Sequence, residues 1–216
     1  MQVFADAALA RTRILPVLQL EDAALAAPLA RALVQGGVPV AEITLRTPAA
    51  LAAIARLRRT EPGLLVGAGT VVTATQVREA AGAGAQFVVS PGLDEAIVQA
   101  AQTAGLAVYP GAVTATELQA AQRLGLGVVK FFPAAQSGGP AAIRALHGPF
   151  PGLQLLPTGG ITLENFLRTA QNAITGKPVK VFAFLAPADV LARGDWAAVI
   201  RLCHQARAIA EEVSNG

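Results

Sequence analysis

Short apolar runs alternate with Ala- and Leu-rich helical stretches along the chain. Each run is rich in Val, Leu, Ile or Phe and leads into a turn with Gly or Pro, after which apolar residues recur at a helical period. Successive runs begin about 25 residues apart, which leaves room for a crossover helix, so the pattern predicts a parallel sheet. The eight runs span residues 13–20, 40–46, 64–71, 87–92, 107–113, 128–134, 153–160 and 179–185.

The number of runs separates two ways of arranging such a sheet. An open doubly wound sheet usually has five or six strands, whereas eight strand–helix units are typical of a closed (β/α)₈ barrel. No linker or low-complexity segment divides the 216 residues. We therefore predict the α/β class and a single (β/α)₈ TIM barrel domain over residues 1–216.

Composition narrows the function classes. Apolar residues make up 53% of the chain, but no apolar run reaches the roughly 18 residues that span a bilayer. The first residues lack the basic segment and following apolar segment of a secretory signal peptide. Cys203 is the single cysteine, so no internal disulfide can form. Together these features predict a cytoplasmic protein without a membrane partner. A net charge of +3 and 5% aromatic residues argue against nucleic-acid binding. His147 and His204 lack ligand-like spacing to carboxylates, so we expect neither a metal nor another cofactor.

A lysine interrupts the apolar run "VVKFFPA" at residues 128–134. The 17 basic residues comprise 14 Arg and three Lys, and the other two, Lys177 and Lys180, lie in a polar stretch. An ammonium at Lys130 loses its hydration in a strand of Val and Phe. Either a distant carboxylate neutralises Lys130, or the site uses an amine with a lowered pKa.

Polar residues also gather where the other predicted strands end, which is where the chemistry of such barrels takes place. Glu42, Thr44 and Arg46 share one face of a strand. Glu42 and Arg46 could pair with each other, or Glu42 could face Lys130 across the barrel while Arg46 binds a substrate carboxylate. Thr70 follows "GAG" and could cap the next helix or bind a carboxylate.

Thr158, Gly159 and Gly160 end the seventh run. Their backbone amides have little side chain around them and form a plausible anion cradle, although many turns contain Gly-Gly. The two histidines are expected at the surface or between helices.

Several of these motifs resemble one family. They resemble the bacterial 2-keto-3-deoxy-6-phosphogluconate and 4-hydroxy-2-oxoglutarate aldolases, in order from about residue 13 to 168 and again at 186–196. The motifs are "AEITLRT" (41–47), "VGAGTV" (66–71), "SPG" (90–92), "VVKFFPA" (128–134), "LPTGGI" (156–161) and "APADVLARGDW" (186–196).

The resemblance implies a class I aldolase on a (β/α)₈ barrel, usually a homotrimer. It would cleave a 2-keto-4-hydroxy acid to pyruvate plus an aldehyde, either glyceraldehyde 3-phosphate or glyoxylate. Lys130 would form the Schiff base and Glu42 would shuttle protons. Arg46 and Thr70 would hold the pyruvate carboxylate.

Under the same resemblance, Pro91 and Phe132 would shape the pocket. The chemistry of the residues agrees with this assignment, because apolar neighbours disfavour the ammonium form of Lys130. Lowering a lysine pKa by about three units corresponds to roughly 4 kcal/mol. The protonated imine is then the electron sink, so the cleavage is expected to need no metal.

One segment departs from the family pattern. The family usually has Gly-Gly-Ser near the end of the eighth strand, beside the substrate phosphate, whereas this chain has Val181, Phe182 and Ala183. The surrounding segment 170–185 is also unusual in composition and length. We therefore predict weaker discrimination in favour of phosphorylated substrate. A non-catalytic or engineered trimeric scaffold, and a phosphosugar isomerase without an imine lysine, are the alternative functions.

Overall fold

Eight parallel strands form the centre of the part of the chain that is described. The computed structural model describes residues 2–160, 181–183 and 187–215. Six strands form one sheet in the order β5-β4-β3-β2-β1-β8, and β6 pairs with β7. The strands are β1 (Ile14–Leu18), β2 (Val40–Thr44), β3 (Leu65–Gly69), β4 (Phe87–Val89), β5 (Ala107–Tyr109), β6 (Val128–Phe131), β7 (Gln154–Pro157) and β8 (Val181–Ala183).

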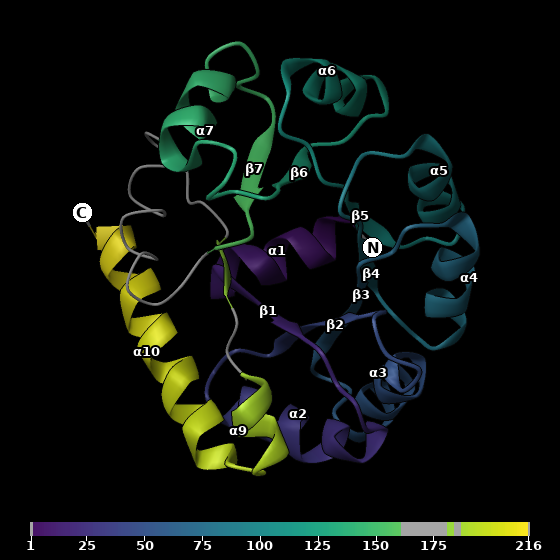
Figure 1. The fold of residues 1–216 in the computed structure, drawn as a ribbon, viewed down its shortest axis with the longest axis vertical. Helices are drawn as coiled ribbons and strands as arrows, with labels where there is room; N and C mark the ends of the chain where they lie inside the picture. The colour runs from purple at the N-terminus through teal and green to yellow at the C-terminus, as the bar shows by residue number, and fades with distance from the viewer. Residues whose placement is uncertain (1, 161–180, 184–186, 216) are drawn as a thin grey trace.

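Two contacts join the six-stranded sheet to the β6–β7 pair. A parallel bridge between Gly111 and Lys130 connects the end of β5 to β6, and β7 packs beside β8. The strands therefore close into the predicted (β/α)₈ barrel (Figure 1). Strands β1 to β7 each fall within a predicted run and are shorter than it, because the runs also included residues of the following turns, and β8 falls within the last run.

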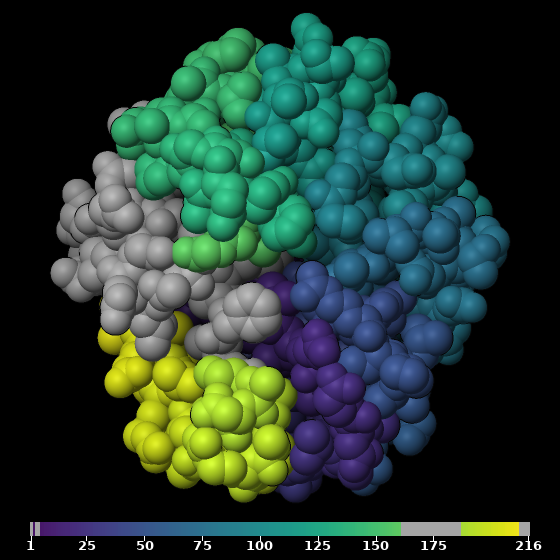
Figure 2. Space-filling model, in the orientation of Figure 1, coloured from purple at the N-terminus to yellow at the C-terminus, as the bar shows by residue number. Residues whose placement is uncertain are grey.

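From η1 onward, helices surround the barrel in chain order. Figure 2 shows the colours passing around the molecule in sequence, so that the N-terminal and C-terminal parts meet, and α10 packs on α2. The helices are α1 (Gln2–Thr12), the 3₁₀-helix η1 (Ala23–Leu25), α2 (Ala26–Gln35), α3 (Ala50–Thr60), α4 (Ala74–Gly82), α5 (Glu95–Thr103), α6 (Ala115–Arg123), α7 (Gly139–His147), α9 (Ala188–Ala192) and α10 (Trp196–Asn215).

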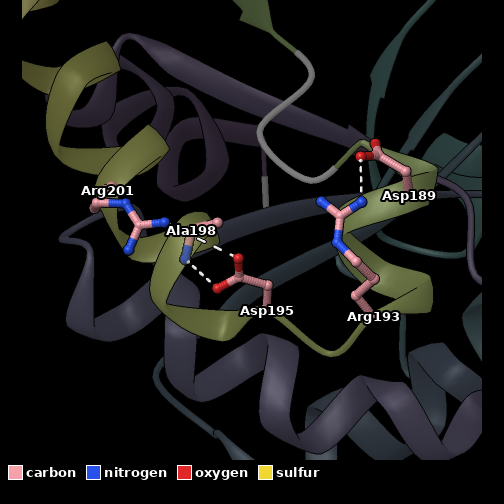
Figure 3. A network of polar contacts seen from close by, with 5 residues as sticks. All are labelled: Asp189, Arg193, Asp195, Ala198 and Arg201. Atoms are coloured by element: carbon pink, nitrogen blue, oxygen red, sulfur yellow. Dashed lines mark hydrogen bonds and ion pairs between the residues drawn. The ribbon is translucent and has the colours of Figure 1, made fainter.

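Polar side chains cap the starts of several helices. Thr73, Asp94 and Thr114 each accept a hydrogen bond from the backbone N–H three residues later, and such a cap stabilises a helix by about 1 kcal/mol. Asp195 does the same for α10, accepting from the backbone N–H of Ala198 at 2.9 Å (Figure 3). These caps fix the points at which the helices leave the loops.

The ion pairs around the start of α10 lie on the surface. Arg193 and Asp189 of α9 are 3.0 Å apart, and Arg201 lies 4.0 Å from Asp195 (Figure 3). All four side chains are well exposed, and exposed pairs of this kind stabilise a protein by about 0–1 kcal/mol each. These ion pairs therefore stabilise only α9 and the start of α10, and only weakly.

Helix α1 crosses the barrel near the strand starts and was not singled out in the sequence. Gln2 lies beside the segments that lead into β5 and β6, and its side-chain oxygen accepts from the backbone N–H of Val108 at 3.0 Å. The Tyr109 hydroxyl donates to Asp6 at 2.7 Å. Burial and the Asp6 carboxylate raise the pKa of Tyr109, so this strand-end tyrosine remains a neutral donor that anchors α1.

The interior face of β3 carries glycines because neighbouring side chains occupy the space. A Cβ on Gly67 would lie 2.2 Å from the ring of Phe87, which projects from the adjoining strand β4. Phe87 is fully buried and stacks edge-on against Tyr109, with 5.9 Å between ring centroids. Gly67 thus lets one large aromatic ring fill the barrel interior.

Gly67→Ala is expected to destabilise the protein by about 1–3 kcal/mol, since the buried Phe87 ring cannot move aside without strain. Gly82→Ala is the matched control, because a Cβ at the end of α4 meets nothing within 4 Å. Urea unfolding should show the loss only for Gly67→Ala, with partial recovery in Gly67→Ala/Phe87→Leu. Equal stability of the two single variants would show that the barrel interior has room to spare.

Candidate active site

Lys130 lies on β6 inside the barrel, with 6% of its surface exposed. Its backbone is held against the segment after β5, where its N–H donates to Pro110 and its carbonyl accepts from Ala112, both at 2.8 Å. Burial lowers the pKa of Lys130, and the positive charge of Arg46 lowers it further, while the nearby Glu42 carboxylate opposes both effects. The lowered pKa increases the fraction of neutral, nucleophilic amine.

An aromatic ring lies against the same amine. The Lys130 Nζ is 4.5 Å from the centroid of the half-buried Phe132 ring. A cation over a ring face is stabilised by about 0.5–2 kcal/mol. Phe132 therefore orients the lysine whenever it is charged and gives it an apolar neighbour when it is neutral.

Glu42 lies on β2 and is completely buried. Neither carboxylate oxygen accepts a hydrogen bond from any described residue. Burial raises the pKa of Glu42 to about 7, although Lys130 and Arg46 lower it. A carboxyl group with a pKa near neutrality is populated in both protonation states, which suits a general acid and base.

The structure brings Glu42, Lys130 and Arg46 within electrostatic reach of one another. Because nothing described hydrogen-bonds to the Glu42 oxygens, Glu42 and Arg46 do not form a direct hydrogen-bonded pair, and the two side chains act on each other through their charges. Arg46 follows the end of β2 and is exposed, whereas Thr44 is buried and donates its hydroxyl to the Leu18 carbonyl at 3.2 Å. Arg46 can meet an anion from solution, and Thr44 supports the strand.

Thr70 follows β3 with an unusual backbone. Its φ of 56° places a β-branched residue in the left-handed region, at a cost of roughly 1–3 kcal/mol. The helix-cap interpretation is wrong, because Thr73 caps α4 by accepting from the Gln76 N–H. The strained and half-buried Thr70 is therefore available for another role at the strand end.

The loops after β4 and β5 lie close together near Lys130. Pro91 is half-buried, and the preceding Ser90 is buried and donates its hydroxyl to the Gly92 carbonyl at 2.7 Å. A Cβ on Gly111 would lie 2.0 Å from the Pro91 carbonyl oxygen. Gly111, which the sequence did not mark, thus lets the Pro91 loop approach the strand end that bridges to Lys130.

The residues after β7 form a tight turn beside the segment that follows β6. Gly159 and Gly160 have φ values of 92° and 74°, and the Thr158 carbonyl accepts from Ala134 at 2.7 Å. A Cβ on Gly159 would lie 3.2 Å from the Phe132 ring. The predicted anion cradle therefore borders the wall of the site that Phe132 forms.

The two histidines and the cysteine lie on helices outside the barrel. His204 is exposed on α10 and His147 ends α7. Burial raises the pKa of the Cys203 thiol to about 12. Val181–Ala183 form β8, and residues 170–180 and 184–185 lie outside the described part of the chain.

Among the described residues, no three His, Cys, Asp or Glu side chains come together in a way that could hold a metal ion. The same part of the chain contains no helix long and apolar enough to cross a membrane.

Comparisons with known proteins agree on one family. The family model "KDPG and KHG aldolase" matches residues 5–202. A 2-dehydro-3-deoxy-phosphogluconate aldolase of Treponema pallidum is 42% identical, covering 92% of this chain and 93% of its own. The KHG/KDPG aldolase of Escherichia coli is 39% identical and covers 94% of each chain. A KDPG aldolase structure from Legionella pneumophila, with pyruvate captured at low pH as a covalent carbinolamine, has a TM-score of 0.87 at 34% identity and covers 93% of this chain and 97% of its own.

The raised pKa of Glu42 predicts a pH-dependent stability. The value of about 7 in the folded protein exceeds the ordinary value of 4.5, so between these pH values the folded state binds more protons than the unfolded state. The free energy of unfolding therefore falls as the pH rises through this window. Glu42→Gln removes this contribution, and its stability relative to the parent should rise by roughly 3 kcal/mol between about pH 4.5 and pH 8.

Urea unfolding of both proteins at several pH values measures this difference. Both chains share every other titratable group, so the contributions of groups that do not interact with Glu42 cancel in the comparison. A stability difference that stays constant across the window would show that Glu42 titrates normally in the folded protein.

Proposed function

The chain belongs to the KDPG and KHG aldolase family, and from the geometry of its site we propose that it cleaves a 2-keto-4-hydroxy acid through a Schiff base. The products would be pyruvate and an aldehyde: glyceraldehyde 3-phosphate from 2-keto-3-deoxy-6-phosphogluconate, or glyoxylate from 4-hydroxy-2-oxoglutarate. The observation that carries the proposal is the buried Lys130 amine of lowered pKa beside the buried Glu42 carboxyl.

Lys130 supplies the nucleophile. Its neutral amine attacks the C2 carbonyl of the keto acid to form a carbinolamine, which loses water to give a protonated imine. When the C3–C4 bond breaks, its electron pair moves into the imine and forms an enamine. The imine is the electron sink, so this chemistry needs no metal ion.

Glu42 moves the protons. Its carboxylate takes the proton of the C4 hydroxyl as the C3–C4 bond breaks and the aldehyde leaves. The resulting acid can return a proton to C3 of the enamine, and hydrolysis of the imine then releases pyruvate. A pKa of about 7 lets the same group accept and give the proton at neutral pH.

Arg46 and Thr70 would hold the substrate carboxylate. The Arg46 guanidinium is exposed at the end of β2 and electrostatically coupled to both catalytic groups. Thr70 offers a hydroxyl at the end of the neighbouring strand β3. Strain at a β-branched residue with φ of 56° supports a functional role for Thr70. Pro91 and Phe132 would shape the apolar part of the pocket.

Thr158, Gly159 and Gly160 would bind the distal end of the substrate. The loops after the seventh and eighth strands of such barrels commonly bind phosphate through backbone amides. The names of the Treponema and Escherichia relatives support a phosphorylated substrate for this chain. The departure at Val181–Ala183 affects the second half of this site.

The resemblance to the aldolase family also suggests a domain organisation, an oligomeric state and a location for this protein. We propose that residues 1–216 act as one barrel domain in a cytoplasmic homotrimer.

Borohydride reduction in the presence of pyruvate tests the central proposal. The imine at Lys130 should be reduced to a stable secondary amine, seen as a mass increase on the peptide that contains Lys130. Lys130→Arg keeps the charge but lacks a usable nucleophile, so both the trapped adduct and keto-acid cleavage should vanish.

Lys177→Arg is the matched control and should trap pyruvate like the parent. Trapping at Lys130 would also exclude the scaffold and isomerase alternatives, neither of which needs an imine. Imine-dependent turnover that persists in Lys130→Arg would contradict the assignment.

The eighth strand gives a separate prediction about substrate choice. Replacing Val181, Phe182 and Ala183 by Gly, Gly and Ser should restore small residues and a hydroxyl near the phosphate. Two or three recovered charge-assisted hydrogen bonds, at roughly 1.5–3 kcal/mol each, should raise kcat/KM for the phosphorylated substrate several tens-fold or more. The control is kcat/KM for 4-hydroxy-2-oxoglutarate, which has no phosphate and should be barely altered. An equal change for both substrates would indicate a general effect on the fold.

A further inference from the structure

Gly69, the last residue of β3, lies directly against the Glu42 side chain. A Cβ built on Gly69 would lie 2.0 Å from the Glu42 Oε1 and 2.7 Å from both its Cδ and its Cγ. These distances are far shorter than any van der Waals contact. The carboxyl group of Glu42 therefore occupies the space that a side chain at position 69 would fill.

Position 69 requires glycine because a side chain there would collide with Glu42, and not because its backbone conformation requires glycine. Its φ is outside the left-handed region, unlike that of the neighbouring Thr70, so an alanine could adopt the same backbone. The strand cannot easily withdraw either, because the Gly69 carbonyl accepts from Leu45 at 2.8 Å and β3 is paired on both sides. A methyl group at this position would act on Glu42.

The pairing of β2 with β3 explains why the carboxyl lies over Gly69. Glu42 is level with Gly67, and Thr44 is level with Gly69. Strand side chains lean along the strand, so the Glu42 side chain extends from the level of Gly67 toward Gly69. The space over Gly67 is occupied by the Phe87 ring. The two glycines thus accommodate Phe87 and the Glu42 carboxyl at consecutive positions on one face of β3.

Within the described part of the chain, packing and not hydrogen bonding orients the Glu42 carboxyl. Its two oxygens accept no hydrogen bond from them, although the residue is completely buried. A catalytic carboxyl is usually directed by hydrogen bonds, and here the shape of the space has that role.

We propose that Gly69 is a positioning residue for Glu42: the missing side chain on β3 holds the carboxyl where it can exchange protons with a substrate bound at Lys130. The inference rests on the proposed function, since it assigns Glu42 the proton transfers. Gly69 acts on the reaction only through Glu42 and touches no reacting atom.

A double-mutant cycle in turnover tests the proposal. Gly69→Ala should lower kcat about 10²-fold with little change in KM, because a displacement of about 1 Å is enough to misplace a proton-transfer group. Glu42→Gln should lower kcat by about 10²–10⁴-fold. In the Glu42→Gln background, Gly69→Ala should change kcat by less than about threefold, since the group that it displaces no longer transfers a proton.

Gly67→Ala is the matched control in the same cycle. It adds a methyl group two residues earlier on the same face of β3, where the three nearest atoms to the methyl all belong to the Phe87 ring. Its effect on kcat should therefore be the same in the parent and in the Glu42→Gln background. If Gly69→Ala also lowers kcat by the same factor in both backgrounds, the proposal is wrong.

A second cycle covers the outcome in which Gly69→Ala fails to fold. Glu42→Ala removes the carboxyl and frees its space, so Glu42→Ala/Gly69→Ala should fold with a melting temperature close to that of Glu42→Ala alone. A double variant that remains unfolded would overturn the proposal, because the collision would then be with something other than Glu42.

Pyruvate trapping separates this inference from the proposed function. The parent and Gly69→Ala should both trap pyruvate at Lys130, since the amine is not displaced. Failure of the parent to trap would refute the Schiff-base function itself. Trapping in the parent together with equal effects of Gly69→Ala in both backgrounds would refute only the role of Gly69.

Discussion

Two ionisable groups lie buried in an apolar barrel, and their loss of hydration governs the chemistry of this site. Removing the Lys130 amine and the Glu42 carboxyl from water favours the neutral form of each, and their mutual attraction only partly restores the charges. The same desolvation that destabilises the folded protein therefore brings both groups toward the protonation states that imine chemistry uses at neutral pH.

The barrel supplies this environment through the choice of neighbours. Strand interiors of Val, Leu and Phe exclude water around Lys130, and Phe132 lies over the amine. The charge of Arg46 acts from the exposed rim, where it can also meet an anion. Functional groups that lie at the strand ends keep access to substrate, while the layers beneath them consist of tightly packed apolar side chains.

Small residues give the site its geometry. Gly67 and Gly69 on β3 admit the Phe87 ring and the Glu42 carboxyl, and Gly111 admits the Pro91 loop. In each case a neighbouring atom occupies the space that a side chain at the glycine would need. At the edge of the site, Thr70 adds backbone strain, because it is a β-branched residue in the left-handed region.

The class of fold and the central chemical group follow from the amino-acid sequence alone. Eight apolar runs separated by helical segments predicted the barrel, and a lysine within Val and Phe marked the buried amine, because periodicity and the cost of burying charge are both local properties. The neighbours that each group meets are visible only in the folded protein. The structure shows that Glu42 lacks a described hydrogen-bond partner and that Gly69 borders the Glu42 carboxyl. These facts depend on strands distant in sequence coming side by side, and no pattern within a single segment carries that information.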